Sequence, residues 1–190
     1  MLPFSLRILF AIVFIPLCFQ VGPWNTGHAE LPPRQYRELL EIAELIETGN
    51  IKKAKKLAKR ISQQDQELIY HMHFFKPRKK RGVGFEKDGG PHDGIELKIR
   101  RLSQARISTS VLKKEKEDLL DLIYRVKAVN LIFRHLPPRN GKHLWDKYCC
   151  DLDQASDDFA FAVKEQHPVL LYLASVRITK SCQQCHVMFR

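Results

Sequence analysis

The stretch PVLLYLASVRITKSCQQCHVMFR, residues 168–190, decides how this 190-residue chain is read. Its apolar residues recur every three or four positions, which is the spacing of a helix with one buried face. That face carries Leu171, Ala174, Ile178, Cys182, Cys185 and Phe189. Proline suits the first turn of a helix, so we predict a helix from near Pro168 onward. The two cysteines then lie on the line of the core residues.

The stretch ends in the spacing C-x-x-C-H, formed by Cys182, Cys185 and His186. Residues three and four apart share one side of a helix, so both thiols and the imidazole point the same way. This spacing is the attachment motif of haem c, in which the thiols bond the two vinyl groups and the imidazole binds the iron. One covalent haem c, with His186 as axial iron ligand, is therefore the predicted cofactor.

Three other readings of the motif remain: half of a zinc site, a redox dithiol and a structural disulfide. A structural zinc site needs about four ligands, and the adjacent pair Cys149 and Cys150 has the wrong spacing to complete one. A redox dithiol follows a strand in a βαβ unit, and no strand pattern precedes Cys182.

The amino-terminal residues predict export. Met1–Phe19 holds a single charge, Arg7, before an apolar run of about a dozen residues, which is short for a membrane span. Small residues at Gly27 and Ala29 suit a signal peptidase, so we predict a signal peptide at 1–29 and no stable membrane anchor. Residues 30–190 then form one haem domain in the periplasm, where haem c attachment takes place.

The chain is basic, with 32 Lys and Arg against 21 Asp and Glu, a formal charge of +11. Export argues against nucleic acid as the partner. The charge is concentrated in Lys52, Lys53, Lys55, Lys56, Lys59 and Arg60, and in Lys76, Arg78, Lys79, Lys80 and Arg81. These runs are either a solvated surface or a docking surface for an acidic redox partner.

Helical periodicity continues through the rest of residues 30–190. Residues 34–48 place four residues on one stripe: Tyr36, Leu40, Ala43 and Ile46. The next stretch turns inward Ile51, Ala54, Leu57, Ala58 and Ile61, and a third piece near 65–75 presents Leu68, Ile69, Met72 and Phe75. Two longer helices follow at about 109–136 and 143–166, the second with the stripe Trp145, Tyr148, Leu152, Ala155, Phe159 and Ala162.

Residues 76–94 form a basic glycine-rich loop, with five glycines and two prolines. Such composition resists packing. A loop of this length is more often functional or disordered than a neutral connector, so a position against the haem edge or a partner is one reading.

The ending Cys182–Arg190 matches C-x-x-C-H-x-x-[FY]-R, and in this the chain resembles the cytochrome c prime family. The resemblance implies an all-α fold: an antiparallel four-helix bundle with a C-terminal haem-binding helix, here with extra N-terminal helical segments. It implies that Cys182 and Cys185 form the thioethers, that His186 is the proximal ligand, and that Arg190 lies near the haem. Homodimers are common in the family, so a homodimer is an alternative to a monomer.

The front half of the chain departs from the family pattern, so the distal iron ligand is open. If the piece before the loop takes the distal position, Met72 is the first candidate, because a thioether makes a low-spin electron-transfer haem. His71 and His73 are its rivals. A Met among apolar neighbours is also common core filling, which leaves the distal side open.

Cys149 and Cys150 are a leftover pair, either free thiols, a disulfide or a redox pair. Neighbours on a helix point about 100° apart, so a bond between them requires distortion. The acidic cluster Asp151, Asp153, Asp157 and Asp158 on the same helix gives little support to a metal site.

The sequence thus predicts a periplasmic monohaem c-type cytochrome that transfers single electrons to a partner protein. The alternative is a five-coordinate haem protein that binds nitric oxide or carbon monoxide. No nucleophile with its base and no pair of catalytic carboxylates is recognisable, so we do not predict an enzyme.

Overall fold

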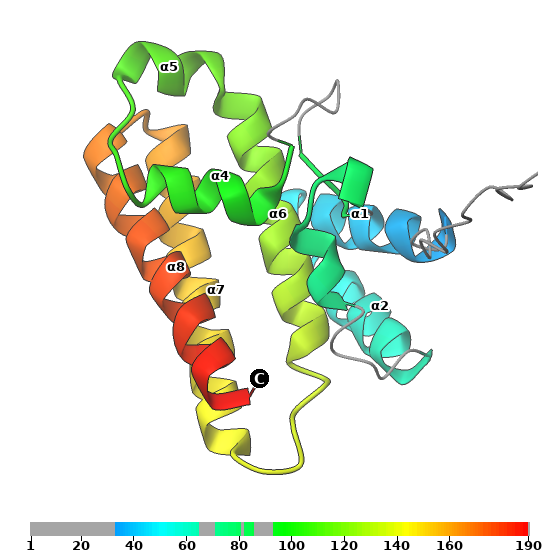
Figure 1. Ribbon diagram of the computed structural model, residues 1–190. Coiled ribbons are helices and arrows are strands. Elements are labelled where there is room, and N and C mark those ends of the chain that lie inside the picture. The colour runs from blue at the N-terminus through cyan, green and yellow to red at the C-terminus, as the bar shows by residue number, and fades with distance from the viewer. Residues whose placement is uncertain (1–32, 65–70, 81, 86–92, 190) are drawn as a thin grey trace, which may run out of the picture.

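A computed structural model describes residues 33–64, 71–80, 82–85 and 93–189. Its regular secondary structure in these ranges is entirely helical, which confirms that the fold is all-α (Figure 1). The α-helices are α1 (Pro33–Glu47), α2 (Ile51–Gln64), α4 (Ile95–Leu102), α5 (Thr109–Lys114), α6 (Lys116–Phe133), α7 (Lys142–Lys164) and α8 (Pro168–Phe189). Two 3-10 turns are η1 (His73–Phe75) and η2 (Arg78–Lys80). The predicted signal peptide, Leu68, Ile69, Arg81 and Arg190 lie outside the described residues.

Helices α7 and α8 form a long antiparallel hairpin along one side of the molecule (Figure 1). The periodicity of both segments predicted the two helices, and the stripe of α8 lies inward as expected, with Leu171, Ala174 and Ile178 almost fully buried. The inward stripe of α7 differs at one place: Cys149 is buried, whereas the predicted Tyr148 is only partly so. Counting four residues on from Trp145 gives Cys149, and three more give Leu152. These three residues form the line of α7 that faces α8.

Helix α6 lies between the α7–α8 hairpin and the pair formed by α1 and α2, and packs against all three of α1, α2 and α7 (Figure 1). It is buried on most of its surface, as expected of a helix with neighbours on several sides. The predicted helix over 109–136 was too long, because the chain breaks at Glu115 between α5 and α6. There Lys98 of α4 pairs with the Glu115 carboxylate at 2.6 Å, a tertiary contact that periodicity does not reveal.

The first two helices are confirmed with corrections to their buried faces. In α1 the fully buried residues are Leu39 and Ile42, while the predicted Leu40 is only partly buried. In α2 the expected Ala54, Leu57, Ala58 and Ile61 are buried. Ile51 is 41% exposed, so its predicted inward position was wrong. It is the first residue of α2, directly after the turn at Gly49, and there the helix has not yet met its neighbours.

The sequence missed α4 altogether. This helix buries Ile95, Ile99 and Leu102 and runs across α8 (Figure 1). It is only eight residues long and follows directly on the glycine-rich stretch, so its periodic signal was too short to separate from a loop.

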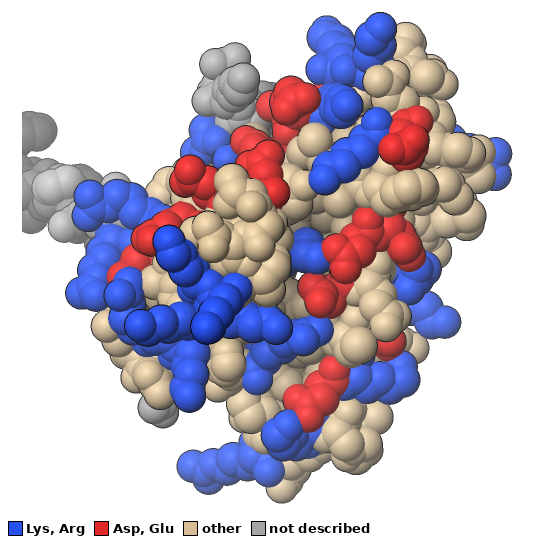
Figure 2. Space-filling view, turned by 180° about the vertical axis from the view of Figure 1, so that it is seen from behind, with Lys and Arg blue, Asp and Glu red and all other residues tan. Residues whose placement is uncertain are grey.

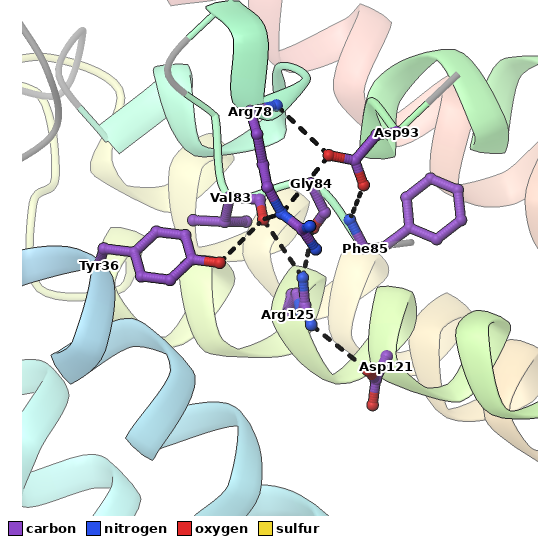
Figure 3. A network of polar contacts seen from close by, with 8 residues as sticks. All are labelled: Tyr36, Arg78, Val83, Gly84, Phe85, Asp93, Asp121 and Arg125. Atoms are coloured by element: carbon purple, nitrogen blue, oxygen red, sulfur yellow. Dashed lines mark hydrogen bonds and ion pairs between the residues drawn. The ribbon is translucent and has the colours of Figure 1, made fainter. Parts of the chain in front are cut away.

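The expectation that residues 76–94 resist packing was wrong for the part that the structure describes. Val83 and Phe85 are 0% and 2% exposed, and the Asp93 side chain is equally buried. Hydrogen bonds explain this burial, because they provide partners for the backbone N–H and C=O groups of the glycine-rich segment. The Asp93 carboxylate accepts from the Phe85 N–H at 2.6 Å and pairs with Arg78 Nε at 3.5 Å (Figure 3).

The other side of segment 82–85 is held by α6 and α1. Arg125 of α6 donates to the carbonyl of Gly84 at 2.6 Å and to that of Val83 at 3.3 Å (Figure 3). The Tyr36 hydroxyl of α1 donates to the Val83 carbonyl at 3.4 Å. The glycine-rich segment is therefore a tertiary connection between α1, α4 and α6.

Gly84 allows a direct test of this connection. Its φ is +58°, and a Cβ there would lie 1.9 Å from Oδ2 of Asp93. We expect Gly84→Ala to lower the free energy of unfolding by about 3 kcal/mol, through left-handed strain and loss of the Asp93 contacts. The matched control is Gly49→Ala, since Gly49 has a φ of +76° and nothing within 4 Å of a built Cβ. Urea unfolding followed by circular dichroism measures both, and equal losses would contradict a role for the Asp93 contact.

Candidate functional site

Cys182, Cys185 and His186 lie on the last two turns of one unbroken helix, α8. Successive residues of a helix turn by about 100°, so Cys185 and His186 flank the direction of Cys182. Both thiols are partly buried and pack against the hydrophobic core. His186 is exposed, as are Val187 and Met188 at 83% and 51%. The three groups predicted from the motif are thus together, with the thiols inward and the imidazole open to solvent.

A row of aromatic rings lines this end of α8. Phe189 contacts Trp145 and Tyr148 of α7, with ring centroids 5.4 and 6.4 Å apart. Trp145 continues to Phe133 at 6.1 Å, and Phe133 to Phe75 at 6.2 Å. We call Phe75, Phe133, Trp145, Tyr148 and Phe189 the aromatic row. It supplies apolar, polarizable surface beside the motif.

Two local features fix the aromatic row. The Trp145 indole N–H donates to the carbonyl of Phe133 at 2.9 Å, which joins α7 to the end of α6. Gly141, which precedes α7, has a φ of +77°, and a Cβ there would come within 3.1 Å of the Phe189 ring. Glycine at 141 therefore permits both the turn into α7 and the close approach of α8.

The four cysteines in the described part of the chain are all free thiols. Cys149 is buried, whereas Cys150 is exposed, so the two side chains diverge as helix geometry predicts. The structure has no bond between Cys149 and Cys150, and an intermolecular disulfide or a redox function of this pair stays a prediction. The buried position of Cys149, beside Cys185, is the site feature that sequence reasoning missed.

Burial controls the acidity of these thiols. It raises the pKa of Cys149 to about 12, and the neighbouring Cys185 thiol adds to the effect. The pKa of Cys182 also rises to about 12, through burial first and then through Cys185 and Glu96. Burial likewise raises the pKa of Cys185. Because a thiolate is the nucleophilic form, thiols that are mostly protonated at neutral pH argue against a catalytic cysteine nucleophile.

A pH dependence of stability follows from Cys149. Below its ordinary pKa of 9.0 the thiol is protonated in both the folded and unfolded states. Above pH 9 only the unfolded chain ionises it, so the free energy of unfolding falls until the pH reaches about 12. The slope is at most about 1.4 kcal/mol per pH unit for this one proton.

Urea unfolding of the reduced, haem-free chain between pH 8 and 11 measures that slope. Cys149→Ala is expected to reduce the slope by the contribution of one thiol, because Cys182 and Cys185 still contribute. Cys150→Ala, which changes the exposed neighbour, is expected to leave the slope as in the unsubstituted chain. If the two variants have the same slope, the buried thiol is not its source.

The candidates for a distal iron ligand lie at and just before η1. His71 is fully buried and its ring lies 5.6 Å from that of Phe74. Met72 is partly buried and packs against the hydrophobic core, and His73 is partly exposed. Phe75 connects this segment to the aromatic row. Met72, His71 and His73 therefore stay predictions as ligands.

The two basic runs differ in their surroundings. All six cationic residues of α2 are exposed. Figure 2 shows lysine and arginine side chains gathered at the left, the side that α2 occupies after the half-turn from Figure 1. In the second run Lys79 and Lys80 are exposed, but Arg78 is tied to Asp93. We call the six residues Lys52, Lys53, Lys55, Lys56, Lys59 and Arg60 the basic face.

The acidic residues of α7 face cations. Asp151 pairs with Lys147 at 2.6 Å, Asp153 with Arg134 at 3.2 Å, Asp157 with Lys127, and Asp158 with Arg177. Within the described ranges, no three His, Cys, Asp or Glu side chains are placed to hold a metal ion. These α7 carboxylates therefore form ion pairs within α7 and between α7 and its neighbouring helices.

Comparisons with known proteins place the chain in no family. Scans of family models, of curated proteins and of solved structures all returned no match. Within the ranges described above, no helix has both the length and the apolar character to cross a membrane. Function therefore has to be argued from the site itself.

Proposed function

We propose that this protein is a periplasmic monohaem c-type cytochrome that transfers single electrons. Cys182 and Cys185 would hold the haem through thioethers, and His186 would bind the iron from one side. The observation that carries the proposal is the placement of two free thiols and an imidazole on the last two turns of α8. When bound, haem supplies the one-electron chemistry of its iron.

The residues around the motif suit a haem. Its iron takes four ligands from the porphyrin, so a single protein imidazole suffices and no cluster of protein ligands is needed. The exposed His186 ring is free to take an axial position without breaking a core contact. The aromatic row and the two inward thiols offer an apolar boundary next to it. Apolar surroundings and limited solvent access tune the reduction potential of a haem.

The finer architecture is part of the same proposal. Helix α8 would be the haem-carrying helix of a cytochrome c prime-like antiparallel bundle, with α7 and α6 as the next two helices. The α1–α2 pair would take the place of the remaining helix. The packing of α6 against α7, α1 and α2 supports this assignment.

The basic face supports an acidic protein as the redox partner. Helix α2 contains no Asp or Glu, and its exposed cations are within reach of the carboxyl-terminal end of α6, where Lys59 lowers the pKa of His135 after the larger effect of burial. Opposite charges accelerate association at low salt. Electron exchange with an acidic partner would accordingly slow as salt rises.

The second candidate is a haem protein with an open iron position that binds carbon monoxide or nitric oxide. The packing of Met72 against the hydrophobic core favours it, because a thioether engaged in core filling is not available to iron.

Visible spectra of the exported, haem-loaded protein test both candidates. Electron transfer predicts a low-spin spectrum, in oxidised and reduced forms, that carbon monoxide does not change. Gas binding predicts a high-spin spectrum that shifts when carbon monoxide is added. A protein without a haem band after export in a haem c-competent host would reject the proposal.

Met72→Ala separates the distal candidates within this experiment. If Met72 is a ligand, its loss converts the low-spin spectrum to high spin. The matched control is Met188→Ala, since Met188 is 51% exposed on α8. A spectrum unchanged in both variants would make Met72 a core residue.

A further inference from the structure

The register of the α7–α8 hairpin brings two cysteines of different helices face to face. At one end of the hairpin Trp145 of α7 stacks edge-on against Phe189 of α8, with centroids 5.4 Å apart. Four residues forward on α7 and four back on α8, which is about one turn on each antiparallel helix, lead to Cys149 and Cys185. Asp158 and Arg177 form an ion pair farther along, so the register persists.

Burial agrees with this register. Cys149 is 6% exposed and belongs to the hydrophobic core, and Cys185 is partly buried against that core. Packed helices lie about 8–10 Å apart, and their Cα atoms stand about 2.3 Å off each axis. Directly facing Cα atoms are then about 3.4–5.4 Å apart, and the upper half of this range overlaps the roughly 4.4–6.8 Å of disulfides.

The other cysteines have different neighbours. One turn back along α8 from Cys185, the register places Cys182 opposite Leu152. Cys150 is exposed and its Sγ accepts from Gln154 at 3.8 Å, on the outer side of α7. Among the four described thiols, Cys149 and Cys185 are therefore the pair that faces across the helix interface.

We propose that Cys149 and Cys185 form a disulfide between α7 and α8 in the oxidising compartment, and that this bond withholds Cys185 from haem attachment until it is reduced. The capacity to form the disulfide depends on the α7–α8 geometry, and its formation needs an oxidant. Its effect on haem attachment rests on the proposed function.

A disulfide-containing oxidant such as oxidised glutathione balances the reaction. Cys185, which is the more exposed of the two, loses its proton to solvent, and the thiolate attacks the oxidant to form a mixed disulfide, releasing one glutathione thiolate that takes up a proton. Cys149 then attacks the Cys185 sulfur, likewise as the thiolate, which forms the protein disulfide and releases a second glutathione. The two protein thiols lose two electrons and two protons, and one glutathione disulfide gains them.

Peptide mapping tests the bond without any haem. The reduced, haem-free chain is equilibrated with oxidised and reduced glutathione, remaining thiols are alkylated, and trypsin cuts after Lys147, Lys164 and Lys180. We expect peptide 148–164 linked to peptide 181–190, and loss of the linkage when the exchange is run in 8 M urea. A bond within 181–190, between Cys182 and Cys185, with Cys149 alkylated would overturn the proposal.

Two variants with equal numbers of cysteines sharpen the mapping. Cys150→Ser with Cys182→Ser retains the facing pair, and Cys149→Ser with Cys185→Ser retains the two cysteines that do not face each other. We expect at least tenfold more linked peptide from the first variant. Equal yields from variants with matching helical circular dichroism would refute the assigned pair.

A haem-attachment assay tests the second half of the proposal. The oxidised chain is expected to take up covalent haem only after a thiol reductant is added, whereas Cys149→Ser takes it up without reductant. If both chains need the reductant equally, Cys149 does not control attachment. If no chain takes up haem under any condition, the proposed function fails, while the mapped disulfide stands or falls on its own peptides.

Discussion

We expect the paired substitution Cys182→Ser and Cys185→Ser to abolish covalent haem. Serine is close to cysteine in size, but its hydroxyl cannot form the thioether that would join each cysteine sulfur to a vinyl group of the haem. The measurement is haem staining after a denaturing gel, which removes haem that is held without a covalent bond. The matched control is Cys149→Ser with Cys150→Ser, which removes two thiols from the neighbouring helix and should retain the stain.

His186→Ala completes this experiment, because it should leave both thioethers and change the spectrum of the iron. Stain that survives loss of both Cys182 and Cys185 would show that these thiols are not the attachment points. A spectrum unaffected by His186→Ala would remove His186 as the axial ligand.

The largest expected loss of stability is that of Trp145→Ala, at about 3–5 kcal/mol. Trp145 is 2% exposed, contacts the rings of Phe133 and Phe189, and donates its indole N–H to the Phe133 carbonyl. The substitution leaves a cavity where α6, α7 and α8 meet, and the Phe133 carbonyl keeps only its hydrogen bond from the Leu136 N–H. Urea unfolding of the haem-free chain, followed by circular dichroism, measures the loss.

Two further variants separate the contributions at Trp145. Trp145→Phe keeps an aromatic ring and removes the hydrogen bond, so we expect a smaller loss, of about 1–3 kcal/mol. Phe161→Ala removes a ring on the same helix that is 57% exposed, and should cost less than about 0.5 kcal/mol. If Trp145→Ala were no worse than Phe161→Ala, the aromatic row would not hold these helices together.

Periodicity was a sufficient guide where a helix is long and has one buried side. It placed α2, α7 and α8, and it put Cys182 and Cys185 on the inward stripe of α8. It failed for α4, which is short and adjoins a glycine-rich stretch. Such a helix is stabilised by packing onto α8, and this contact is invisible in a local pattern.

The glycine-rich segment was misjudged for a similar reason. Its composition predicts poor packing, but a buried carboxylate at Asp93 and a guanidinium from Arg125 supply the missing backbone partners. These residues stand eight and about forty positions away from the groups that they bind. Only the folded chain brings them together.

Within the candidate site, the motif gave three residues and the fold added a fourth. Both Tyr148 and Cys149 lie at helical spacing from Trp145, so a single helix does not reveal which of them turns inward. The choice is made by the pairing with α8, where Cys149 matches Cys185. The sequence signal that could have identified Cys149 is a spacing of inward residues that alternates between four and three positions on both helices.

The α7–α8 hairpin also bears on the order in which the chain folds. Its two helices are consecutive, so closing it costs little loop entropy, and contacts between nearby segments form early. The contact of α4 with α8, and that of Arg125 with Gly84, join segments far apart in the chain. The hairpin is thus expected to form first, with Cys182, Cys185 and His186 already presented on a helix while the amino-terminal half is still docking.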